Sequence, residues 1–144
     1  MQFHHVGISV SSLERSIAFY RDKLDMDLMA GPFPLGGPEV GAVTALDNVA
    51  VQVCIMRKGN LTLELFEFAH PEPQRQNPDY PVCNHGISHF GVTVADIDAT
   101  YARLAARGVR FHSTVRQFPG GMRAAYGHDP DGNVFELLEE PRNN

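Results

Sequence analysis

The chain opens with apolar and polar residues in alternation, the pattern of a strand that buries one face. Apolar residues then recur at helical spacing, after a Ser11 that fits a capping box with Glu14. The runs Val49 to Arg57 and Leu61 to Phe68 predict two more strands, joined by a turn at Lys58-Gly59-Asn60. The first half of the chain is therefore predicted to form a strand, a helix and further strands.

The same pattern returns in the second half as a diverged repeat. His5-Val6-Gly7-Ile8 matches His89-Phe90-Gly91-Val92 at an offset of 84 positions, whereas Leu63-Glu64-Leu65 matches Phe135-Glu136-Leu137 at an offset of 72. The first copy is therefore longer by 12 residues. We expect this surplus in Gly31 to Val43, whose glycines and prolines predict a loop.

The second copy carries clear signals for where its helix and last turn lie. Asp96 is a plausible N-cap, and Gly108 stands where such a helix ends. Asp129-Pro130-Asp131-Gly132 suits a type I turn between the last two strands. Each copy is therefore approximately βαβββ.

These elements predict an α+β fold in which two βαβββ modules form a curved mixed sheet around a cleft. The modules are expected at residues 1–68 and 87–144, within one compact domain. Residues 69–86 contain four prolines and predict a linker, because proline disfavours helix.

Four polar residues lie opposite the most apolar face of their strands, at equivalent positions in both copies: His5, Glu64, His89 and Glu136. Carboxylates that face a semi-enclosed cavity need a compensating charge, because desolvation and mutual repulsion oppose ionisation. A divalent cation supplies that charge, and two imidazoles with two carboxylates suit Zn, Ni, Co, Mn or Fe. The pattern therefore predicts one divalent metal ion held by all four residues.

Other residues compete for these roles. His4 is the alternative to His5, but it falls on the apolar side of its strand and Ser88 occupies its place in the repeat. Glu67 and Glu139 also repeat, on the side opposite the four expected ligands, and we expect both to face solvent.

The paired His-x-Gly strands and the ending Asp129 to Leu137 resemble the vicinal oxygen chelate superfamily over almost the whole chain. That group includes glyoxalase I, methylmalonyl-CoA epimerase, extradiol dioxygenases, and the fosfomycin and bleomycin resistance proteins. The resemblance implies two βαβββ modules around a metal cleft, often in a homodimer. It places the metal ligands on His5, Glu64, His89 and Glu136.

The ligand pattern most resembles glyoxalase I and the epimerase, which implies a metal-dependent lyase or isomerase that transfers a proton next to a metal-bound carbonyl. Glu136 or Glu64 would then be the catalytic base, with a slight preference for Glu136. Bacterial glyoxalase I carries an Arg and an Asn for glutathione where this chain has Ser9 and Phe68, so another small-molecule substrate is expected. The alternatives are an Fe(II)-dependent ring-cleaving dioxygenase and a small-molecule-binding resistance protein.

Four residues are candidates for substrate contact: Gln52, Arg123, Tyr126 and His128. Tyr126 stands ten positions before Glu136, as Cys54 stands before Glu64, and the two are taken as repeat counterparts. Arg123 is the nearby cation that suits an anionic substrate group. Ordinary filling of a barrel interior is the competing interpretation of Tyr126 and His128.

Composition further limits the binding partners and the cellular location that we expect. A net charge of -5 without a basic run argues against nucleic acid as a partner, and no apolar run reaches the roughly 20 residues that span a membrane. Cys54 and Cys83 are isolated, which predicts free thiols and a cytoplasmic protein.

Overall fold

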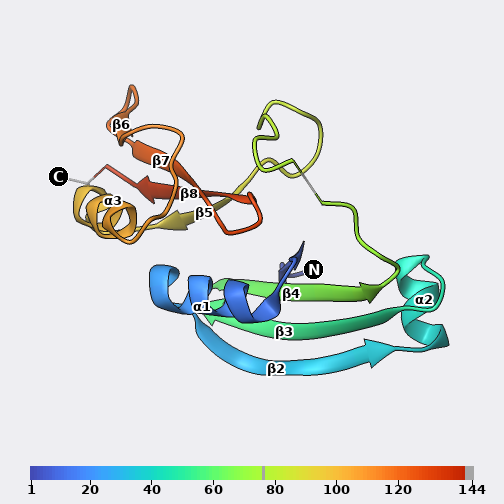
Figure 1. Ribbon diagram of the computed structural model, residues 1–144. Helices are drawn as coiled ribbons and strands as arrows, with labels where there is room; N and C mark the ends of the chain where they lie inside the picture. The colour runs from blue at the N-terminus through green and yellow to red at the C-terminus, as the bar shows by residue number, and fades with distance from the viewer. Residues whose placement is uncertain (76, 142–144) are drawn as a thin grey trace. The chain divides into compact units, whose positions relative to one another are not determined.

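The computed structural model describes residues 1–75 and 77–141, which divide into two compact units, residues 1–75 and the described part of 76–144. We call them the first unit and the second unit and describe each by itself. The first unit holds one four-stranded mixed sheet, in which α1 lies along one face (Figure 1). Its elements are β1 (Val6–Ser9), α1 (Leu13–Leu24), β2 (Asp27–Gly36), α2 (Pro38–Thr44), β3 (Ala50–Lys58) and β4 (Leu61–His70).

The second unit repeats this plan with a shorter edge and without a counterpart of α2 among its described residues (Figure 1). The strand orders are β1-β4-β3-β2 and β5-β8-β7-β6, and the pairs β1/β4 and β5/β8 are parallel. The predicted α+β class and the two βαβββ modules are thereby confirmed. The elements of the second unit are β5 (Phe90–Thr93), α3 (Ile97–Ala106), β6 (Arg116–Gln117), β7 (Arg123–His128) and β8 (Val134–Glu139).

The prediction of a loop at Gly31 to Val43 is wrong, because this segment completes β2 and forms most of α2. β2 is the edge strand, so Pro32 and Pro34 tolerate the loss of an N–H on its unpaired side. The register with β3 shifts around Gly31, where a Cβ would collide with a carbonyl oxygen of β3. Glycine and proline therefore mark a bulged edge strand here rather than a loop.

The helix-covered face of each sheet forms the core. In the first unit β1 buries Ile8, and β4 buries Leu63 and Leu65 completely, as the alternation predicts. In the second unit Phe135 and Leu137 take the same positions and are equally buried. Burying a side chain of this size contributes roughly 1.5–3 kcal/mol, so these strand positions hold each sheet against its helix.

The helices begin close to the predicted positions. The N-cap of α1 is Ser12 rather than Ser11, and its Oγ accepts from the Arg15 N–H at 3.3 Å. Asp96 caps α3 as predicted, since its Oδ1 accepts from the Ala99 N–H at 2.9 Å. Gly108 follows the end of α3 with a φ of 81°, the left-handed conformation that favours glycine after a helix.

The prediction that Glu67 and Glu139 face solvent is wrong. Glu67 accepts a hydrogen bond at 2.6 Å from the N–H of Leu13, the first residue of α1. Glu139 accepts one at 2.7 Å from the N–H of Ile97, the first residue of α3. Their strand parity directs both carboxylates to the helix-covered face, where they satisfy an N–H that has no partner within the helix.

The predicted turns before the last strand of each copy are present. β3 and β4 are joined at Gly59 and Asn60. In the second unit the buried Asp129 accepts hydrogen bonds at its Oδ1 from the N–H groups of Asp131 and Asn133, at 2.9 and 2.8 Å. None of the helices in the described ranges has the length and apolarity to cross a membrane.

Candidate metal centre

In the first unit, His5 and Glu64 form a close pair. Glu64 lies on β4 with Gly7 of the parallel strand β1 as its backbone partner, and His5 precedes that glycine by two residues. The Nε2 of His5 lies 3.0 Å from the Oε2 of Glu64. On the other side of its ring, the Nδ1 of His5 lies 2.6 Å from the Nδ1 of His4. His5 rather than His4 therefore faces the carboxylate.

The second unit repeats this arrangement with His89 and Glu136. Glu136 pairs with Gly91 across β5 and β8, and the Nε2 of His89 lies 3.4 Å from its Oε2. The Nδ1 of His89 lies 2.9 Å from the Oγ of Ser88. Both glutamates are largely shielded from water, with side-chain exposures of 21% and 18%. Each unit therefore holds one carboxylate against the Nε2 of one histidine.

The glycine opposite each carboxylate keeps a side chain off the sheet surface beside the pair. A Cβ on Gly91 would lie 3.5 Å from the Oε2 of Glu136, in the direction of the carboxylate. A Cβ on Gly7 would lie 3.2 Å from the ring of Phe66, which stands two residues after Glu64. The His-x-Gly pattern therefore combines a donor with an open sheet surface beside it.

Both pairs fit the ligand spacing of a metal ion. Two donors held about 2.1 Å from one ion lie about 3.0 Å apart at a right angle and about 3.4 Å apart at a tetrahedral angle. The distances are 3.0 Å in the His5–Glu64 pair and 3.4 Å in the His89–Glu136 pair. Within ranges 1–75 and 77–141, no three His, Cys, Asp or Glu side chains gather as a metal site. Each unit by itself thus contributes two donors.

Tyr126 joins the pair in the second unit. It faces Glu136 across β7 and β8, and its hydroxyl lies 3.4 Å from the Nε2 of His89. The two rings lie 4.6 Å apart between centroids. Burial, and then the charge of Glu136, raises the pKa of Tyr126, so the phenol keeps its proton at neutral pH. This places a neutral hydroxyl donor beside the histidine and the carboxylate.

His128 lies two residues beyond Tyr126 on the same face of β7. Its ring is tilted at 55° to that of His112, with 4.6 Å between the centroids, and its Nδ1 lies 3.2 Å from an Nη of Arg110. Arg110 in turn donates to the carboxylate of Asp79 at 2.8 Å. The Nε2 of His128 is buried and has no hydrogen-bond partner among the described residues. Burial is the main cause that lowers the pKa of His128.

Gln52 is not brought to this face in the first unit. In the register of β3 with β4, Gln52 pairs with Glu67, whereas Ile55 pairs with Glu64. The counterpart of Tyr126 is therefore Ile55, and the predicted equivalence with Cys54 is wrong. The turn between β3 and β4 is shorter than the turn between β7 and β8, which changes the offset by one residue and so reverses the face.

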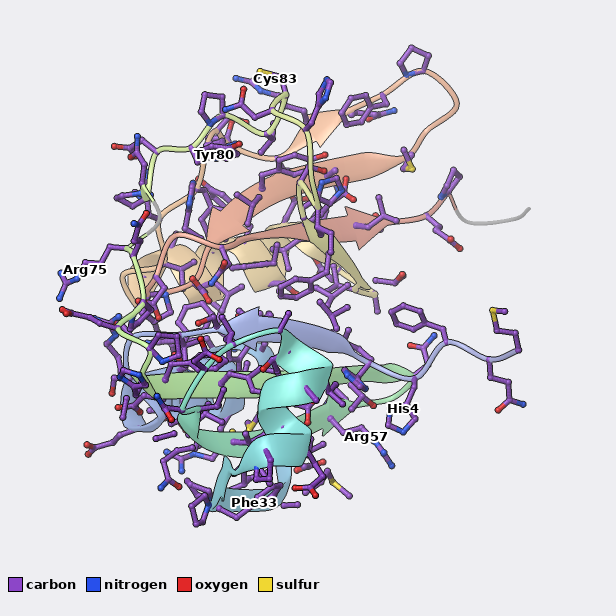
Figure 2. The ribbon with its side chains drawn as sticks, turned by 90° about the vertical axis from the view of Figure 1, so that its right-hand side faces the viewer. His4, Phe33, Arg57, Arg75, Tyr80 and Cys83 are labelled. Carbon is purple, nitrogen blue, oxygen red and sulfur yellow. The ribbon has the colours of Figure 1, made fainter. Side chains whose placement is uncertain are left out.

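Arg57 is a residue of this face that the sequence did not single out (Figure 2). It follows Ile55 by two residues on β3, pairs with Thr62, and donates from its Nε to the Thr62 hydroxyl at 3.2 Å. Its counterpart in the second unit is His128, which pairs with Val134. With the register corrected, the period-two rule would have found it.

Arg123 lies on the opposite face from Glu136, because it pairs with Glu139 across β7 and β8. It donates to both carboxylate oxygens of Asp98 at 2.7 Å and lies 3.6 Å from Glu139. The prediction that it meets substrate on the Glu136 face is therefore wrong. The adjoining segment Phe118–Met122 forms the turn between β6 and β7, in which the Phe118 N–H donates to the Met122 carbonyl at 2.8 Å.

Apart from Arg57 and Thr62, the neighbours of Glu64 on this face are apolar. Val51 and Val53 share it with Phe66 and Phe68, whose rings stack at 6.1 Å between centroids. Phe33 of β2 and Val40 of α2 pack against the same valines. An apolar wall therefore extends from the carboxylate toward α2.

Both cysteines are free, as expected. Cys54 is buried on the core face, and burial raises its pKa to about 11, so its thiol stays protonated. Cys83 is exposed in the segment before β5 (Figure 2). Neither belongs to the His–Glu pairs.

Residues 2–137 match the model of the Glyoxalase/Bleomycin resistance protein/Dioxygenase superfamily. The chain belongs to this superfamily. The match spans both units and includes both His–Glu pairs.

Two related proteins align with nearly the whole chain. A 2-epi-5-epi-valiolone epimerase of Actinomyces sp is 30% identical over an alignment of 151 positions, which covers 96% of this chain and 79% of that protein. Uncharacterized protein YaeR of Escherichia coli (strain K12) is 30% identical over 140 residues, 96% of each chain. One relative is therefore an epimerase.

Solved structures of the superfamily agree with the fold. A glyoxalase family protein from Bacillus cereus has a TM-score of 0.86 and 28% identity, covering 97% of this chain and 94% of that one. Lactoylglutathione lyase from Agrobacterium tumefaciens has a TM-score of 0.62 and 22% identity, covering 96% and 92%. The second likeness concerns the fold alone.

Proposed function

We propose that this chain is a metal-dependent isomerase, lyase or epimerase that moves a proton at the carbon next to a carbonyl group of a small substrate. The observation that carries the proposal is the repetition of one geometry, a histidine Nε2 at 3.0 or 3.4 Å from a glutamate Oε2, in both units. His5, Glu64, His89 and Glu136 would hold one divalent ion. When bound, the ion would polarise the carbonyl and acidify the neighbouring C–H.

The protein's own groups would then move the proton. In the proposed reaction a glutamate Oε accepts the proton from the carbon. The same carboxyl group would return it to the adjacent carbon in an isomerisation, whereas the other glutamate would deliver a proton to the opposite face in an epimerisation. No electrons leave the substrate, so the reaction is an isomerisation without an external oxidant. Glu136 is the preferred base, because the Tyr126 hydroxyl beside it is a donor that can hold a substrate oxygen.

Several features support a substrate other than a glutathione adduct. Ser9 and Phe68 stand where the glyoxalase I pattern has groups for glutathione, and Phe68 packs with the apolar wall. Arg57 adds a guanidinium on the Glu64 face, which takes the role first assigned to Arg123. We therefore propose a 2-substituted carbonyl compound, such as a thioester or a cyclic ketone, whose apolar part lies against Phe66 and Phe68. Tyr126 and His128 remain proposed contacts for its polar part. The epimerase relative supports this reaction class.

Metal analysis of the purified protein is the first test. We expect one divalent ion per chain, and a loss of metal content in His5→Ala, Glu64→Ala, His89→Ala and Glu136→Ala. His70→Ala and Glu72→Ala serve as matched controls, because both residues are exposed and lie outside the pairs. Full metal content in Glu64→Ala would contradict the four-ligand site and favour an iron-dependent oxygenase.

Proton transfer can be followed by deuterium incorporation from D2O into candidate substrates, including 2-epi-5-epi-valiolone, by NMR. We expect exchange without oxygen consumption. Glu136→Gln should reduce exchange at least about 100-fold, because the amide cannot accept the proton, although its oxygen still resembles a ligand. Glu64→Gln should reduce exchange less. The reverse order would make Glu64 the base, and oxygen consumption without exchange would exclude this reaction class.

A further inference from the structure

The residue before each paired histidine contacts that histidine on the side away from the carboxylate. His4 and Ser88 occupy the same place in the repeat, 84 positions apart. The Nδ1 of His4 lies 2.6 Å from the Nδ1 of His5, and the Oγ of Ser88 lies 2.9 Å from the Nδ1 of His89. His4 projects from the chain just before β1 (Figure 2). The same position of the repeat therefore holds an imidazole in the first unit and a hydroxyl in the second unit.

We propose that His4 and Ser88 are positioning residues that fix the orientation and the tautomer of His5 and His89. The inference rests on the proposed metal-dependent function and deepens it. Each neighbour accepts a hydrogen bond from the Nδ1–H of the histidine that follows it. The lone pair of the histidine is then at Nε2, the atom that lies 3.0 or 3.4 Å from the glutamate.

The chemistry of imidazole explains why this contact matters. A neutral histidine has one N–H and one lone pair, so a partner at Nδ1 decides which nitrogen is free to bind a metal. A serine hydroxyl accepts the Nδ1–H directly. His4 accepts it only through a lone pair at its own Nδ1, and its proton is then at Nε2. The ring planes of His4 and His5 are nearly perpendicular, at 82°, and their centroids lie 4.9 Å apart, so the two Nδ1 atoms meet at the ring edges.

The two contacts differ in exposure, which predicts unequal effects. The contact between Ser88 and His89 is partly buried, whereas that between His4 and His5 is exposed. Water can replace His4 more easily than Ser88. Groups that orient a metal-binding histidine typically change metal affinity 10–100-fold. We expect Ser88→Ala to lie near the upper end of that range, at about 100-fold, and His4→Phe near the lower end, at about 10-fold.

Zn2+ affinity, measured by competition with a chromogenic chelator, is the first readout. Ser88→Thr should keep the affinity of the natural protein within about threefold, since it retains the hydroxyl. His4→Ser, which introduces the residue of the second unit, should recover at least part of what His4→Phe loses. Ser113→Ala and His70→Phe are matched controls, because both residues are exposed and neither belongs to a His–Glu pair. Equal affinities for Ser88→Ala, His4→Phe and the natural protein would overturn the inference.

A second readout needs no metal. NMR shifts of 13C- and 15N-labelled histidine side chains in the metal-free protein report which ring nitrogen carries the proton. Without a metal, the glutamate carboxylate accepts a hydrogen bond from Nε2–H and so opposes the Nδ1–H form. We therefore expect both tautomers at His5 and His89 in the natural protein, and a shift of His89 toward the Nε2–H form in Ser88→Ala. Unchanged tautomers would overturn the positioning role even if the protein binds Zn2+. A natural protein that binds no Zn2+ but shows the tautomer change would instead overturn the proposed function alone.

Discussion

The two units share a scaffold and a histidine–glutamate pair, but they differ in what surrounds the pair. In the first unit the strand neighbour of Glu64 is Ile55, and the face continues into a wall of valine and phenylalanine. In the second unit the strand neighbour of Glu136 is Tyr126, and the face continues into His128. The donors are duplicated, whereas their surroundings have diverged. For the proposed function, this asymmetry suits a substrate with one apolar part and one polar part.

The cores of the two units solve one packing problem in opposite ways. On the helix-covered face Met56 pairs with Leu63 in the first unit, and Gly127 pairs with Phe135 at the equivalent place in the second. All three large side chains are completely buried. A large residue opposite a small one fills the same layer as two residues of medium size. This comparison predicts that substituting only one residue of either pair destabilises the core.

Gly127→Ala should have the largest effect. A Cβ there would lie 2.5 Å from the Cζ of Phe135 and 3.0 Å from the Cε1 of Phe111, and Phe135 is completely buried. We expect the free energy of unfolding to fall by about 2–3 kcal/mol, as for overpacked cores. Urea unfolding followed by circular dichroism measures the change.

The partner substitution distinguishes packing from a general effect of alanine in a strand. Phe135→Leu should destabilise the protein by about 1–2 kcal/mol through a cavity, and combining it with Gly127→Ala should cost about 1 kcal/mol less than the two separate effects together. Gly7→Ala is the matched control, because its Cβ would meet only the edge of Phe66 at 3.2 Å. Strict additivity would contradict the idea that the two sizes compensate.

Glu67→Ala and Glu139→Ala should have the next largest effects. Each carboxylate accepts from the first N–H of a helix, at 2.6 and 2.7 Å. Losing a charged cap of this kind costs about 1–2 kcal/mol, and the glutamine variants should lose less because an amide oxygen still accepts. Glu139→Ala should cost slightly more, since Glu139 also lies 3.6 Å from Arg123. Thermal unfolding of each variant provides the comparison.

An exposed acidic residue of α1 serves as the control for the Glu67 and Glu139 variants. Glu14 lies in the first turn of α1 and faces solvent. Its interaction with the helix dipole is worth only a few tenths of a kcal/mol, up to about 1 kcal/mol. If Glu67→Ala were no more destabilising than Glu14→Ala, the capping contact would contribute nothing.

The sequence was sufficient for the features that depend on strict periodicity. Period-two alternation identified the buried Leu63 and Phe135 and the opposite-facing Glu64 and Glu136, because a strand has only two faces. The repeat identified the modules, because equivalent residues bury equivalent surfaces.

The sequence did not predict the features that depend on the length of a turn or on a contact with a residue far away in the chain. A turn shorter by one residue reversed the face of Gln52, and an edge strand accepted prolines that indicate a loop elsewhere. The parity of Glu67 was correct, but its partner, the start of α1, comes from 54 residues away in the sequence. Arg123 was excluded from the candidate site for a similar reason, since Asp98 of α3 binds it.

The smallest effect concerns pH and tests His128, whose counterpart in the first unit is Arg57. Burial chiefly lowers the pKa of His128, aided by the charges of Arg110 and His112 and opposed by the Gly132 carbonyl and Asp79. The unfolded chain therefore takes up the proton first, at a pKa of about 6.5. Stability that is present above this pH is lost as the pH falls, because unfolding then binds a proton.

His128→Asn should remove this dependence. Between pH 7 and pH 5 the natural protein should lose more of its free energy of unfolding than the variant does, whatever their difference at pH 7. Urea titrations at several pH values measure both slopes, and His85→Asn provides an exposed histidine control that should follow the natural protein. Equal slopes for the His128 variant and the natural protein would mean that the buried imidazole gains a proton as easily as an exposed one. The two units would then differ in shape and polarity on this face, but not in their response to acid.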